Sequence, residues 1–265
     1  MSAVTPDPWE GLRAHTRARI ALGRAGGSLP TAELLGFSAA HAAARDAVWS
    51  ALDVDALALG LLPAGLPLVR VRSQAPDRAT YLQRPDLGRR LDAEAEPTLA
   101  RARAEGRQDG PDGCDLALLV ADGLSATAAQ LHAPALVGLL APRLRARGFR
   151  LGPLTVALQA RVALEDAVGA ALGARAALIL LGERPGLGSP DSLGAYLVFG
   201  PRPGRTDAER NCVSSIRPDG FPIPAAAELL EWLIAESLRR ALSGVELKDE
   251  RGTVAAGSAT TPLGA

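Results

Sequence analysis

Residues 111 to 249 alternate short apolar runs with segments of helical length, and no other feature limits the possible folds as strongly. Leu116 to Val120 is a continuous apolar run, and 154–162, 176–181 and 195–201 are the other predicted strands. A wholly apolar strand is typical of a sheet covered on both faces, and helices between such strands are the usual connections of a parallel sheet. The pattern therefore predicts an α/β fold with a doubly wound, mostly parallel, Rossmann-like sheet.

The segments between the apolar runs predict the helices of this sheet. Ser125 is placed to cap a long amphipathic helix that ends near Arg147. Residues 163–174 predict a second helix, and residues 224–244 predict a closing amphipathic helix. Strand and helix thus alternate along most of this half of the chain.

The first 110 residues have a weaker pattern. Residues 31–52 are rich in alanine and predict a helix, whereas 67–74 alternate valines with arginines and predict a short, half-exposed strand. We expect an N-terminal arm and mainly helical region at 1–110, a Rossmann-like domain at 111–249 and a disordered tail at 250–265.

The charge balance and the apolar content exclude several classes of partner. Lys+Arg and Asp+Glu both number 29, so the net charge is +0 and no nucleic-acid partner is expected. No apolar run approaches the roughly 20 residues of a membrane span, and the N-terminus lacks the apolar stretch of a signal peptide. With only Cys114 and Cys212 present, we expect reduced thiols, a cytoplasmic location and no membrane partner.

The familiar active-site motifs of α/β enzymes are absent from the sequence. The one lysine, Lys248, does not stand in a Gly-Lys-Ser/Thr phosphate loop, and Gly23, Gly26 and Gly27 do not have the GxGxxG spacing. No GxSxG elbow occurs, and the three histidines and two cysteines do not reach zinc spacing. These absences exclude an ordinary P-loop NTPase, and we expect no metal ligand on this chain.

Two polar segments are not required by a plain sheet. Glu183 and Arg184 directly follow the run 176–181, where an open sheet presents its ligand-binding edge. On chemistry alone, a salt-bridged loop end is favoured for this pair. Residues 206–221 are polar and turn-rich and contain Cys212, for which a small apolar contact is favoured over a nucleophile.

Six stretches of the chain occur in the order and with the spacing typical of one family. They are RARIALGRAGGSLPT, HAAARDAV, DGLSA, ILLGERPGLGSPDSLGAYL, RNCVSSIRPDG and SGVELKD. Together they resemble the small-subunit family of ethanolamine ammonia-lyase. The resemblance implies adenosylcobalamin as the cofactor and the conversion of ethanolamine to acetaldehyde and ammonia.

The resemblance also implies that the catalytic residues and some of the cofactor contacts lie on two different chains. The catalytic residues belong to a large subunit that forms a TIM barrel, so this chain is expected to act only in a hetero-oligomer. Cofactor contacts carry over to Val162, Glu183 and Cys212, of which Val162 is predicted to close the strand at 154–162. The family commonly has glycine where this chain has Leu164, so the resemblance does not carry a close backbone approach there.

The sequence also bears on the state of the cofactor and on the main alternative. No histidine lies in a DxHxxG string, with which another class of cobalamin proteins supplies a ligand to cobalt, so base-on binding is expected. The alternative is a free-standing α/β enzyme that binds a nucleotide or a flavin, and the missing phosphate loop disfavours it. The sequence leaves open whether the complex enters a bacterial microcompartment.

Overall fold

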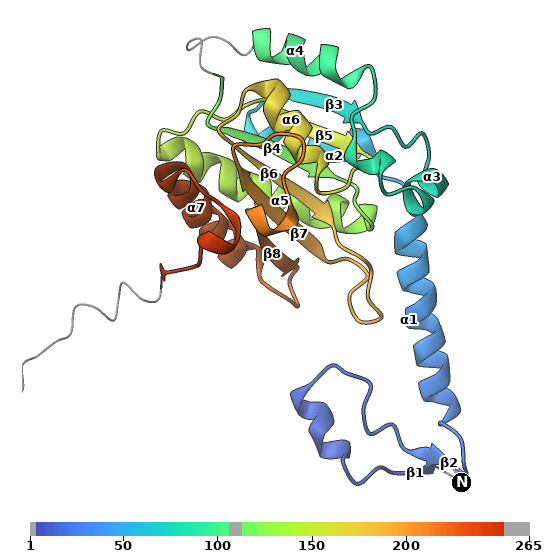
Figure 1. The fold of residues 1–265 in the computed structure, drawn as a ribbon. Helices are drawn as coiled ribbons and strands as arrows, with labels where there is room; N and C mark the ends of the chain where they lie inside the picture. The colour runs from blue at the N-terminus through green and yellow to red at the C-terminus, as the bar shows by residue number, and fades with distance from the viewer. Residues whose placement is uncertain (1–3, 106–112, 252–265) are drawn as a thin grey trace, which may run out of the picture.

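The computed structural model describes residues 4–105 and 113–251, and a six-stranded sheet lies at its centre (Figure 1). The strand order is β3-β5-β4-β6-β7-β8. β3, β5, β4 and β6 are parallel, while β7 and β8 run antiparallel to their neighbours. The strands are β3 (Leu68–Arg72), β4 (Leu116–Ala121), β5 (Leu154–Leu158), β6 (Ala176–Gly182), β7 (Leu193–Phe199) and β8 (Arg210–Ile216). The predicted α/β fold with a mostly parallel sheet is confirmed.

Helices cover both faces of this sheet because successive side chains of its central strands enter two different cores. In β4, Leu118 and Val120 pack into one core, and Leu119 and Ala121 pack into the other. The first core is closed by α2 (Val54–Leu61), α5 (Ala126–Ala146) and α7 (Ile223–Arg240), and the second by α4 (Ala95–Glu105) and α6 (Leu164–Leu172). The uninterrupted apolar runs in the sequence are the direct consequence of this two-sided burial.

The predicted start of α5 is confirmed at Ser125. Its side chain accepts a hydrogen bond from the backbone amide of Ala128 at 3.2 Å and also donates to the carbonyl of Pro190 at 2.8 Å. The second bond ties the start of α5 to the loop between β6 and β7. One serine therefore caps a helix and anchors the loop that begins at Glu183.

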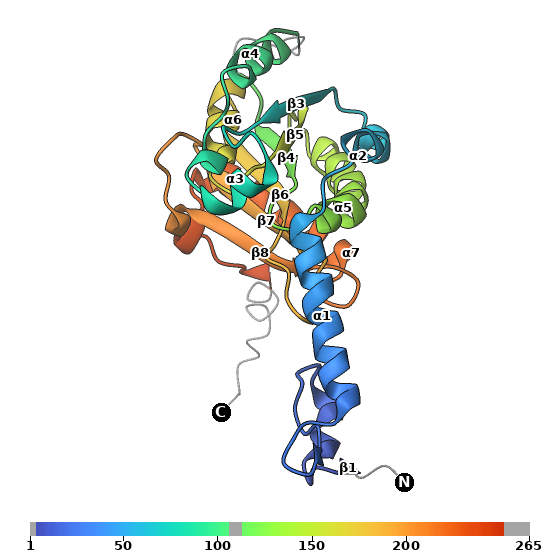
Figure 2. The same cartoon turned by 90° about the vertical axis from the view of Figure 1, so that its right-hand side faces the viewer.

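The N-terminal arm lies away from the sheet. Two short strands, β1 (Val4–Thr5) and β2 (Arg24–Ala25), pair at the far end of α1 (Thr31–Trp49), which projects from the body of the protein (Figures 1 and 2). The remaining helices are α3 (Arg78–Gln83) and the 3₁₀ turns η1 (Glu10–His15), η2 (Leu62–Ala64), η3 (Leu87–Arg89), η5 (Asp207–Glu209) and η6 (Gly244–Glu246). The predicted helix at 31–52 corresponds to α1.

Two details of the predicted strands are wrong. The strand expected at 154–162 ends at Leu158, and the expected loop at 206–221 contains the strand β8. β8 lies at the edge of the sheet, where Val213 and Ile216 are buried while Cys212 and Ser214 are exposed. An edge strand covered on one face only does not produce the apolar run by which the inner strands are recognised.

β3, which lies within the region predicted as a separate N-terminal part, is hydrogen-bonded into the main sheet beside β5. The division into parts at residue 110 remains a prediction, and most of the predicted tail, 252–265, falls outside the described residues.

Among the described helices, none is by itself long and apolar enough to cross a membrane. Thr31–Trp49 and Val54–Ala64 meet the length and composition requirements only as a pair, and this pair is bent by 84°.

Candidate functional site

A pocket of about 430 Å³ opens at the carboxyl end of β6, between the ends of several strands. This is the edge at which open α/β sheets bind their ligands. The wall comes from α3, from the turns after β4 and β5, and from β6, β7 and β8. Its residues are Tyr81, Leu124, Arg161, Val162, Leu181, Gly182, Glu183, Arg184, Tyr196 and Ser214.

Asp122 shapes this edge by drawing the chain after β5 out of the sheet. Its buried carboxylate accepts hydrogen bonds from the backbone amides of Gln159 and Ala160 at 2.9 and 3.1 Å. Gln159 consequently adopts a left-handed conformation, with φ at 53°. The strand ends here, so Val162 lies in the following turn and does not close the strand as predicted.

The charge of Asp122 is balanced by its surroundings. Burial raises the pKa of its carboxyl group, while the backbone amides and the guanidinium of Arg78, 3.7 Å away, act in the opposite direction. Arg78 in turn donates to the carbonyls of Val48 and Gly123 at 2.7 and 2.8 Å. These bonds link the end of α1 to the turn after β4.

Tyr81 forms the floor of the pocket between two arginines. Its ring is fully buried, its hydroxyl donates to the carbonyl of Ala160 at 3.1 Å, and the guanidinium carbons of Arg78 and Arg161 lie 4.8 and 4.3 Å from the ring centroid. Two cations on one aromatic ring fix the position of both side chains. Arg161 is therefore held in place at the pocket wall before any ligand binds.

Arg161 also has an unused hydrogen-bond donor. Its Nη2 donates to the carbonyl of Tyr81 at 3.1 Å, whereas its Nε is buried and has no hydrogen-bond partner among the described residues. Buried polar atoms are nearly always paired, so a donor left unpaired beside a pocket suits a polar ligand. The residues of the pocket wall therefore fit a cofactor that carries polar side groups.

Cys212 lies next to the pocket on β8, directly opposite Tyr196 of β7. The residue is exposed, in contrast to the small apolar contact favoured from the sequence. Partial burial of the thiol and the nearby Glu183 carboxylate raise the pKa of Cys212. The thiol is thus protonated at neutral pH and unsuited to act as a nucleophile.

The structure brings Val162 and Glu183 together in the pocket wall, with Cys212 at its side. Glu183 does not form the arginine pair favoured on chemistry alone, because its carboxylate accepts hydrogen bonds from Ser192 and from the backbone amide of Ser215. Leu164 is fully buried in the core. Tyr81, Arg161 and Tyr196 were not predicted as site residues, and only Arg161 has a signal in the sequence, its position next to Val162.

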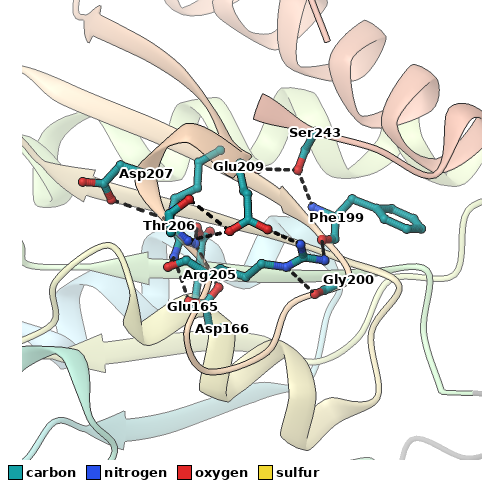
Figure 3. A network of polar contacts seen from close by, with 10 residues as sticks. Glu165, Asp166, Phe199, Gly200, Arg205, Thr206, Asp207, Glu209 and Ser243 are labelled. Carbon is teal, nitrogen blue, oxygen red and sulfur yellow. Dashed lines mark hydrogen bonds and ion pairs between the residues drawn. The ribbon is translucent and has the colours of Figure 1, made fainter. Parts of the chain in front are cut away.

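A buried ion network joins the first turn of α6, which follows Val162, to the strand that carries Cys212. Arg210 of β8 donates to both carboxylate oxygens of Asp166 at 2.7 and 2.9 Å and to Glu165 at 2.6 Å. All three side chains are at most 3% exposed. Figure 3 shows Glu165 and Asp166 close to the segment that carries Arg205 and Thr206, and Arg210 also donates to the carbonyl of Arg205 at 3.2 Å.

The fold and the pocket define an α/β protein with a pocket at the carboxyl edge of a mostly parallel sheet, the edge at which such sheets bind ligands. The ethanolamine ammonia-lyase light chain family matches residues 6–248, which is nearly the whole chain. The chain belongs to this family. The free-standing nucleotide- or flavin-binding enzyme, kept as the alternative from the sequence, is not supported.

Curated relatives agree with the family match. The chain is similar to proteins named ethanolamine ammonia-lyase small subunit from Azotobacter vinelandii, Ralstonia nicotianae and Bradyrhizobium diazoefficiens, with 55%, 51% and 52% identity. The matches cover 94% of this chain in each case, and 91%, 90% and 93% of the three relatives. The chain therefore corresponds to nearly the full length of these proteins.

Proposed function

We propose that this chain is the small subunit of an ethanolamine ammonia-lyase and that it holds adenosylcobalamin at the pocket beside β6. The observation that carries the cofactor assignment is the pocket itself, whose wall contains Val162, Glu183 and Arg161, the last with an unpaired donor. Two of the three residues implied by the family resemblance thus line one cavity, although they are 21 positions apart in the sequence.

Each wall residue has a defined task toward such a cofactor. Val162 offers backbone groups and an apolar contact, and Glu183 accepts hydrogen bonds from amide or hydroxyl donors at the cofactor periphery. Arg161 Nε donates to a carbonyl at the same periphery, and the protonated thiol of Cys212 gives a soft contact. Adenosylcobalamin supplies the radical chemistry that converts ethanolamine to acetaldehyde and ammonia, while these residues position and shield the cofactor.

The catalytic residues are proposed to lie on a large subunit with a TIM-barrel fold, which closes the cofactor site from the other side. The names of the relatives support a two-subunit enzyme. The exposed apolar side chains of Leu34, Leu35 and Phe37 on the projecting helix α1 suit a chain that has a protein partner. A Rossmann-like relationship of the sheet, a cytoplasmic location and the absence of nucleic-acid and membrane partners remain parts of the proposal.

The cofactor is expected to bind base-on, because this chain has no DxHxxG histidine to displace the benzimidazole of the cofactor. The test is electron paramagnetic resonance of the cob(II)alamin form in the complex of both subunits after removal of unbound cofactor. We expect a signal whose superhyperfine splitting comes from the cofactor base. Splitting that changes when protein histidine is labelled with nitrogen-15 would contradict base-on binding, and loss of all signal on desalting would contradict the cofactor assignment.

A further inference from the structure

The carboxylate of Glu183 is held by an asymmetric set of hydrogen bonds. Oε2 accepts from the Ser192 hydroxyl at 2.5 Å and from the backbone amide of Ser215 at 3.1 Å. Oε1 has no hydrogen-bond partner among the described residues. A carboxylate has lone pairs for about four donors, so the two bonds at Oε2 leave Oε1 with its full capacity to accept.

The Ser215 amide reaches Glu183 because β8 bulges at this point. Leu193 pairs with Ile216 and Ala195 with Val213, so the single residue Gly194 of β7 faces two residues of β8. Ser215 has φ at 62°, a left-handed conformation that is uncommon for a residue other than glycine. Its amide points at a side chain instead of the neighbouring strand, and bulges commonly redirect groups in this way at functional sites.

Ser192 and Gly194 complete the support of the carboxylate. Ser192 is buried, and its carbonyl accepts from the Glu183 backbone amide at 2.9 Å, so the two residues face each other directly beyond the paired ends of β6 and β7. A methyl group built on Gly194 would lie 3.0 Å from both Cγ and Oε1 of Glu183. A side chain at position 194 would therefore crowd the Glu183 carboxylate.

We propose that Ser192 and the Ser214–Ser215 bulge are positioning elements for Glu183, which occupy Oε2 and present Oε1 to an N–H or O–H donor on the cofactor. This inference rests on the proposed function, since the pocket into which Glu183 is built is the proposed cobalamin site. Without the Ser192 hydroxyl, Oε2 keeps one donor and the side chain gains rotational freedom. Part of the binding free energy is then spent on immobilising the Glu183 side chain when the cofactor binds.

The test measures the affinity of the complex of both subunits for adenosylcobalamin by visible spectroscopy. Ser192→Ala is expected to weaken binding about three- to tenfold, the effect of one hydrogen bond. In a Glu183→Ala background the same substitution should change affinity less than about twofold, because Ser192 acts through Glu183.

Ser189→Ala is the matched control, since Ser189 lies in the same loop and its hydroxyl makes no hydrogen bond among the described residues. Its affinity should equal that of the wild type. Unchanged affinity for Ser192→Ala would overturn the inference, as would an equal loss with and without Glu183. A wild-type complex that does not bind the cofactor would overturn the proposed function together with this inference, so the two failures are distinguishable.

Discussion

Arg210→Ala is expected to lower the free energy of unfolding of this chain by about 3 to 5 kcal/mol, because it leaves two carboxylates buried without their cation. Asp166 and Glu165 are at most 3% exposed, and each loses a hydrogen bond of 2.9 Å or shorter. Burial already raises the pKa of Glu165 well above its usual value, and the neighbouring Asp166 adds to this effect. Urea unfolding followed by circular dichroism measures the loss.

Arg239→Ala is the control for that prediction. Arg239 pairs with Glu236 on the surface of α7 at 2.6 Å, and its side chain is 64% exposed. Exposed pairs of this kind contribute about 0 to 1 kcal/mol, because water and salt screen them. If the two variants lose the same stability, the buried network does not hold α6 to β8 in the way the contacts indicate.

Glu183→Ala is expected to weaken the binding of cobalamin by the assembled complex about ten- to hundredfold. The reason is the loss of a charged acceptor at the pocket wall, since hydrogen bonds to charged groups contribute about 1.5 to 3 kcal/mol. The partners of this carboxylate within the chain are a serine hydroxyl and one backbone amide. Cofactor affinity and thermal unfolding should be measured on the same preparations.

Cys212→Ser provides the comparison for Glu183. The substitution nearly keeps the volume of the side chain and removes no charged acceptor from the pocket, so we expect a clearly smaller loss of affinity. A drop in the melting temperature of Glu183→Ala with unchanged cofactor affinity would show that the residue only supports the loop between β6 and β7, and would remove it from the site.

The inner strands and the helices between them could be predicted from the sequence because their signals are local. Burial on both faces makes β4 and β6 continuous apolar runs, and the cap at Ser125 depends on an amide only three residues away. β8 was missed because one of its faces is open, and the end of β5 was misplaced because it depends on hydrogen bonds from Asp122, 37 residues away from Gln159.

The residues of the candidate site likewise include some that could be predicted from the sequence and some that could not. The resemblance identified Val162, Glu183 and Cys212, yet nothing in the local sequence indicates that Arg161 keeps an unpaired donor or that Tyr81 fixes it in place. The pairing of Arg210 with Asp166 spans 44 residues. Contacts between residues so far apart in the sequence follow from the packing of the whole sheet. The local periodicity of the sequence does not predict them.

The measurement that tests the central claim most directly is the release of ammonia from ethanolamine by purified components. We expect no release by this chain alone or by the large subunit alone, each with adenosylcobalamin, and cofactor-dependent release when the two are combined, because the chain holds the cofactor and the partner carries the catalytic residues. Turnover by this chain alone would contradict the account. So would full activity of the large subunit in its absence.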